Sequence, residues 1–137
     1  MLRERLPRLT VVPELVGRET VAANVEHMVG ELLQFYTASF PIAASIFSQP
    51  KLLASQRAAM EERGAGPREP VRALVTYLEQ ERDLGRIPAY TDVTAVAALL
   101  AGAAFQRAFF TNFEGASDDP DAGLWVTRVV AAAGVTR

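Results

Sequence analysis

The sequence predicts an all-α fold, and three observations carry that prediction. Apolar residues recur at the three- and four-residue spacing of a helical face over most of the 137 residues. Glycine, proline and acidic residues stand where such helices would begin and end. No stretch alternates apolar and polar residues as a half-buried strand does. Because each helix must cover its apolar face with another, we expect a helical bundle of about five to six helices.

Residues 1–17 are expected to form a lead-in segment, and residues 18–137 one helical domain. Prolines and arginines break the lead-in, so it resembles neither a domain nor a signal peptide. The first long helix is predicted from Arg18 to Phe40, with one apolar face. Pro41 lacks an N–H and crowds the preceding turn. The helix therefore either breaks there or kinks and continues to Ser48.

Two less apolar helices are predicted next. Pro50 suits the first turn of a helix, and the following KLLASQRAAMEER is expected to form a half-exposed helix that Gly64 ends. The second runs from Pro67 to Leu84 along a narrow apolar stripe, and Gly85 is expected to cap it.

The stretch from Asp92 to Phe113 is apolar around its whole circumference. It holds four of the seven phenylalanines and only two charged residues, Asp92 and Arg107. Thr91 or Asp92 is its expected N-cap. The unbroken apolar run, residues 95–105, is shorter than the roughly 20 residues of a membrane span. A helix apolar all round must be covered all round, so we expect one face on the domain and another on a second copy. The alternative is the central helix of a monomer.

The last helix is predicted from Pro120 to Ala133, and it too is apolar around much of its circumference. Asp119 is its expected N-cap, with Pro120 in the first turn and Asp121 favoured by the helix dipole.

Composition and motifs exclude several classes of function. The net charge is −2 and no basic stripe lies on any helix, which disfavours DNA binding by these residues. The absence of cysteine fits a cytoplasmic protein. We find neither a P-loop nor a dinucleotide glycine motif. No cofactor and no enzymatic activity are therefore expected.

Titratable residues give no catalytic or metal site. His27, the one histidine, falls on the polar side of its helix and is expected to be exposed. Asp118, Asp119 and Asp121 lack the spacing of a calcium loop, so helix capping is the expected role. The serines lack a suitable base for nucleophilic catalysis.

A small-molecule pocket is expected where the first long helix, the Pro67–Leu84 helix and the central helix meet. Ligand sites are mostly apolar with a few polar groups. Tyr36 and Ser39 interrupt the first apolar stripe and would supply hydrogen bonds, while Phe105 and Phe109 share a face. The candidate residues are Met28, Leu32, Tyr36, Ser39, Leu74, Leu78, Phe105 and Phe109. The alternative is that these side chains only fill the core.

A neutral ligand is expected in this pocket. The nearest cations by sequence are Arg82 and Arg107, and both could reach solvent or a partner instead. A buried carboxylate without a partner is costly.

The order of the segments resembles a known family. FYTASFP ends the first long helix, SQPKLLASQRAAM follows, and VRALVTYLEQERDLGRIP leads into a helix containing LLAGAAFQRAFF. A helix containing Trp125 comes last. This order resembles the C-terminal domain of the tetracycline-repressor (TetR) family of bacterial transcriptional regulators, over nearly all of the chain from Arg18 on.

The resemblance implies a ligand-binding and dimerisation domain. The last two long helices would form a four-helix interface in a homodimer, and the interior would bind a small apolar or aromatic effector. Operator DNA would bind only through an N-terminal helix-turn-helix, which residues 1–17 are too short to hold. The alternatives are a homodimerisation or interaction module without a ligand, and a small helical enzyme.

Overall fold

The computed structural model describes residues 12–135, and the described chain is all-α. The helices are α1 (Val12–Leu15), α2 (Val21–Phe47), α3 (Pro50–Glu62), α4 (Glu69–Asp83), α5 (Val93–Glu114) and α6 (Ala122–Ala132). No strand occurs between residues 12 and 135, so the predicted fold class is confirmed at this level.

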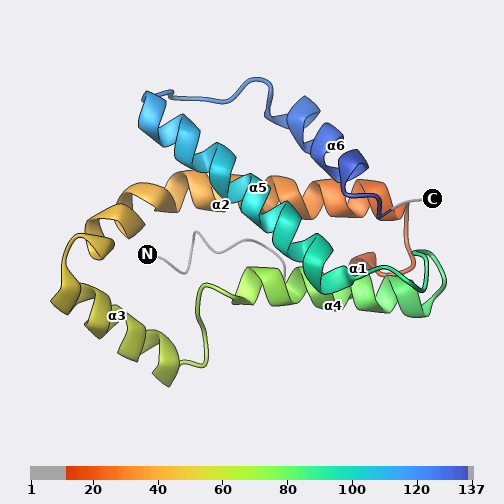
Figure 1. Ribbon diagram of the computed structural model, residues 1–137, viewed down its shortest axis with the longest axis horizontal. Helices are drawn as coiled ribbons and strands as arrows, with labels where there is room; N and C mark the ends of the chain where they lie inside the picture. Colours follow the sequence, from red (N-terminus) through yellow and green to blue (C-terminus); the bar gives the residue numbers. More distant parts are fainter. Residues whose placement is uncertain (1–11, 136–137) are drawn as a thin grey trace.

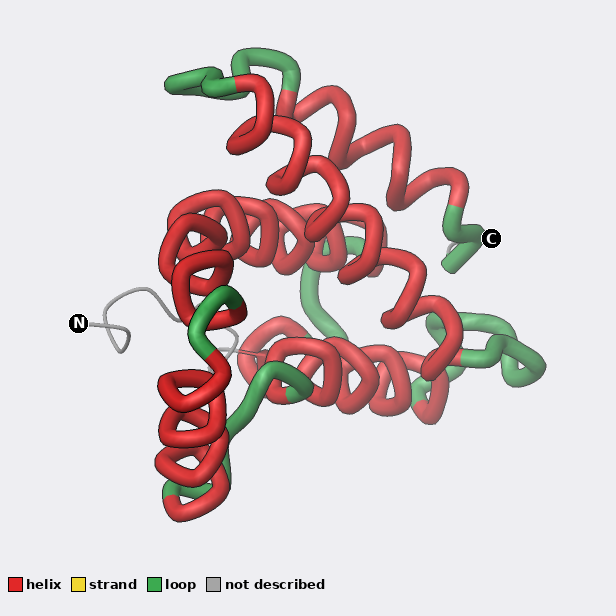
Figure 2. Tube along the Cα trace, turned by 60° about the vertical axis from the view of Figure 1, so that its left-hand side comes forward, coloured by secondary structure: helices red, strands yellow, loops and turns green. Residues whose placement is uncertain are grey.

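The helices pack around α2 and α5, which cross each other (Figure 1). The N-terminal half of α5 rests on α4, and α6 lies against the N-terminal half of α2. Helix α3 projects from the end of α2, as the turned view in Figure 2 also shows. None of the side chains in α3 is buried, so this helix is more exposed than the half-exposed helix expected.

The core lies where α2, α4, α5 and α6 meet. Helix α5 contributes mainly small residues to it, and its neighbours contribute larger ones. The fully buried side chains include Val25, Met28, Val29, Leu32, Leu74, Tyr77, Leu78, Ala97, Leu100, Ala104, Ala108 and Val130. The alanines allow α2 and α5 to approach closely, because the distance between packed helices depends on the side chains at the contact.

Helix α2 continues through Pro41 to Phe47, so the continuation and not the break is observed. Since Pro41 has no N–H, the carbonyl of Thr37 lacks its usual partner four residues on. The Nδ2 group of Asn112 on α5 donates to this carbonyl at 3.1 Å. A tertiary hydrogen bond thus replaces the missing helical one. The helix begins later than expected, after the N-cap Thr20, whose hydroxyl accepts from the Ala23 N–H.

The other helix ends mostly follow the local signals. Asp92 caps α5 by accepting from the Ala95 N–H. Gly64, Gly85 and Gly115 end α3, α4 and α5 with left-handed φ values of 63°, 77° and 73°. The exception is α6, whose N-cap is Asp121 and not Asp119. The Asp119 carboxylate is instead held by Arg107.

Candidate ligand groove and exposed apolar face

An open groove of about 800 Å³ lies between α4, the N-terminal half of α5 and the side of α2. Its lining is mostly apolar, with a few polar groups at the edges. The lining residues are Tyr36, Pro67, Arg68, Val71, Arg72, Val75, Thr76, Glu79, Thr94, Ala98, Ala101, Gly102 and Phe105. The mostly apolar lining and the volume fall within the range of small-molecule sites, although the groove is open to solvent.

Tyr36 and Phe105 are the two expected ligand residues that line the groove. Their rings meet edge to face, with centroids 5.4 Å apart. A phenol is neutral at pH 7, and burial raises the pKa of Tyr36 further above its ordinary value. Tyr36 makes no side-chain hydrogen bond within residues 12–135, which leaves its O–H available to a ligand.

The remaining six expected residues lie outside the groove. Met28, Leu32, Leu74 and Leu78 are 1%, 0%, 0% and 0% exposed and fill the core. The Ser39 hydroxyl donates to the carbonyl of Phe35 in its own helix at 2.7 Å. Phe109 packs edge to face on Phe40, with ring centroids 5.6 Å apart. Helical periodicity put all of them on inward faces, but it carries no information about depth below the surface.

Several groove residues were not expected from the sequence, above all Val71, Val75, Ala98 and Gly102. Small residues on α5 leave the space open beside α4. A Cβ atom at Gly102 would meet nothing within 4 Å. One feature of the sequence could have indicated the groove. Small residues recur on the same face of α5 as Phe105, and a face that only packs on another helix would not need them.

The cations also differ from those expected near the pocket. Arg82 donates to the Thr91 carbonyl at 2.9 Å, and Arg107 pairs with Asp119. Arg68 and Arg72 line the groove instead.

Helix α5 has a second, exposed face that is unusually apolar. Leu99 is 67% exposed, Phe110 49% and Phe113 80%, while four alanines of the same helix, Ala97, Ala101, Ala104 and Ala108, are buried. Leu124 of α6 is 66% exposed. Large exposed apolar patches mark interfaces. One face of α5 is therefore buried in the domain and another is exposed, and its cover by a second copy stays a prediction.

Helix α5 is long enough to cross a membrane. The expectation that it is too short, which was based on the apolar run of residues 95–105, is therefore wrong. The helix has 22 residues, and within the described chain it is the one helix long and apolar enough to cross a membrane. A third of its most apolar window is buried in the protein (33%). That buried part packs on α2 and α4, as the central helix of a folded domain does.

An ion pair and a cation–π contact fix α6 beside α5. The Arg107 guanidinium donates two hydrogen bonds to the Asp119 carboxylate, both 2.6 Å long. It also lies 4.9 Å from the centre of the Trp125 ring. The hydrogen bonds from Arg107 lower the pKa of Asp119. The exposed faces of α5 and α6 are thus held in one orientation.

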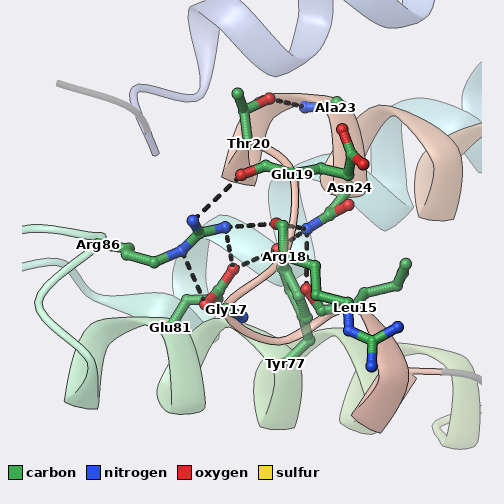
Figure 3. Close-up of polar contacts among 10 residues, drawn as sticks. All are labelled: Leu15, Gly17, Arg18, Glu19, Thr20, Ala23, Asn24, Tyr77, Glu81 and Arg86. Atoms are coloured by element: carbon green, nitrogen blue, oxygen red, sulfur yellow. Dashed lines mark hydrogen bonds and ion pairs between the residues drawn. The ribbon is translucent and has the colours of Figure 1, made fainter.

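A buried polar cluster joins the chain before α2 to the end of α4 (Figure 3). Glu81 is 0% exposed and accepts from the Tyr77 hydroxyl at 2.7 Å and the Gly17 N–H at 2.9 Å. Arg86 donates to both Glu81 oxygens at 3.1 and 3.0 Å. Asn24 donates to the Tyr77 hydroxyl at 3.0 Å. Nothing in the local pattern indicated this cluster.

Arg86 and Asn24 extend the cluster to the backbone before α2. Arg86 also donates to the carbonyls of Arg18 and Glu19, and Asn24 donates to those of Leu15 and Arg18. Every buried polar side-chain atom in the described chain has a partner. The cluster is a satisfied structural network, and its groups are not free to bind a ligand.

The other titratable candidates remain without a site. His27 is exposed and borders a second groove of about 500 Å³ between α2 and α6. Within the described residues, no three histidine, aspartate or glutamate side chains are grouped to hold a metal ion.

Comparison with known proteins identified no relatives. No family model, no curated protein and no solved structure matches the chain.

Proposed function

We propose that this chain is the ligand-binding and dimerisation domain of a TetR-like bacterial transcriptional regulator in the cytoplasm, which senses a small apolar or aromatic molecule. The observation that carries the proposal is the open groove between α2, α4 and α5. Three helices leave an apolar space unfilled there, beside one phenol without a hydrogen-bond partner within residues 12–135.

The two faces of α5 support a combined role. One face lines the groove through Ala98, Gly102 and Phe105. The other, with Leu99 and Phe110, joins α6 in an exposed surface suited to a second copy. A ligand touching α5 would therefore act on the helix that forms the dimer. Operator DNA would be bound by a separate helix-turn-helix, and no catalytic role is proposed.

The groove can be blocked without disturbing the core. Gly102→Leu places a side chain into the groove, where a Cβ meets nothing within 4 Å, and leucine favours a helix over glycine. Ligand at a hundredfold excess over its Kd should stabilise the wild type by about 2.7 kcal/mol. That corresponds to a rise in Tm of roughly 8 °C. We expect a melting screen of small hydrophobic compounds to give such shifts in the wild type and none with Gly102→Leu.

Gly30→Leu is the matched control. Gly30 also lies within a helix with open space at its Cβ, but it borders the second groove, between α2 and α6. This variant should keep the ligand response. Hits that survive Gly102→Leu would place the site elsewhere. A screen without hits would favour the alternative, a dimerisation module with no ligand.

A further inference from the structure

Two arginines stand at one end of the groove. Arg68 is the N-cap residue of α4, and Arg72 lies one helical turn further on, so their side chains project from the same face. Val71 lines the groove between the two arginines, and Val75 and Thr76 line it between Arg72 and Glu79 further along the helix. The groove is thus cationic at one end and apolar along its length.

Both guanidinium groups retain free donors. Arg68 forms no side-chain hydrogen bond or ion pair with the residues that the structure describes. Arg72 bonds Glu69 at 3.0 Å, but the two side chains are 67% and 49% exposed. Such a surface pair contributes little, and one bond uses one of the five N–H donors of Arg72. A ligand anion can therefore recruit both arginines.

The acidic residues limit where an anion can lie. Glu79 follows Arg72 by two turns, about 10 Å along the axis. An anionic group at the Glu79 end would meet a like charge. One at the Arg68 end meets two opposite charges beside the exposed carboxylate of Glu69, which is paired with Arg72. The apolar part of the same molecule would lie along Val75, Ala98 and Gly102.

We propose that the ligand is an amphipathic carboxylic acid, with its carboxylate on Arg68 and Arg72 and its apolar body along α4 and α5. A guanidinium matches a carboxylate with two parallel hydrogen bonds. This inference rests on the proposed function and replaces the neutral ligand expected from the sequence. The neutral ligand was expected because only Arg82 and Arg107 were considered as nearby cations. In the structure both of these bind other groups, and Arg68 and Arg72 line the groove in their place.

The test compares acids with their methyl esters, which share the apolar body but lack the charge. Calorimetric titrations would use 4-phenylbutanoate, decanoate and the two matching esters. We expect the wild type to bind at least one acid about tenfold or more tighter than its ester, because hydrogen bonds to charged groups are the stronger ones. Arg68→Gln and Arg72→Gln should each remove most of that preference, so that the acid binds about as weakly as its ester.

Arg57→Gln, an exposed arginine of α3 outside the groove, is the control and should behave as the wild type. Equal binding of acid and ester, abolished by Gly102→Leu, would overturn the carboxylate while keeping the groove as a ligand site. An acid preference that survives both arginine substitutions would also overturn it. If neither acids nor esters bind, this inference fails, and the compound screen with Gly102→Leu decides the proposed function separately.

Discussion

Leu99→Arg should convert the protein from a dimer to a monomer. Leu99 is 67% exposed in a single chain, on the exposed apolar face of α5. In the protomer, an arginine there would extend into solvent, and such surface changes usually alter stability by less than about 0.5 kcal/mol. In a dimer built on this face, the same charge would be buried without a partner, which is costly. The substitution therefore separates folding from association.

Light scattering at micromolar concentration measures this directly. The wild type should give twice the chain mass of 14.9 kDa, and Leu99→Arg the single mass. Leu84→Arg is the matched control, since Leu84 is 59% exposed at the end of α4, away from the α5 and α6 face. It should remain a dimer. A monomeric wild type would refute the dimer, and dissociation by Leu84→Arg alone would place the interface elsewhere.

Glu81→Ala should lower the free energy of unfolding by about 3 kcal/mol, since removing one member of a buried ion pair leaves its partners unsatisfied. Glu81 holds Tyr77, Arg86 and the Gly17 N–H together. Its loss would also loosen the chain before α2 from α4. Urea unfolding followed by circular dichroism measures the difference.

Glu79→Ala is the control, because Glu79 is exposed two residues away on the same helix and should change stability little. If both substitutions lowered the free energy of unfolding equally, the buried cluster would contribute no more to stability than an exposed glutamate.

The same cluster should make stability depend on pH. Burial alone would raise the pKa of Glu81, but hydrogen bonds from Arg86, Tyr77 and the Gly17 N–H outweigh it and hold the pKa below its usual 4.5. A carboxyl with a depressed pKa stabilises the fold above its unfolded-state pKa, and this contribution is lost as pH falls through the folded-state pKa. The stability difference between wild type and Glu81→Ala should therefore be constant near neutral pH and shrink below about pH 4. A constant difference down to pH 2 would contradict this assignment.

The sequence by itself determined the fold class and most helix ends, because these depend on groups within about five residues of one another. Asp92 caps α5, and Gly64 and Gly85 close α3 and α4 where local rules predicted. The sequence also predicted that α5 is apolar on two faces, because the angle between successive side chains around a helix is fixed.

Only the tertiary structure decided how deeply each side chain is buried and which groups it contacts. Leu32 and Tyr36 share one stripe of α2, yet the first is in the core and the second lines the groove. Asp119 is an adequate N-cap by sequence, but Arg107 of α5 binds its carboxylate and α6 begins after Asp121. Glu81 is buried and accepts a hydrogen bond from the N–H of Gly17, 64 residues away in the chain. Periodicity gives the direction of a side chain around its own helix, whereas burial and ion pairing depend on which other helix lies in that direction.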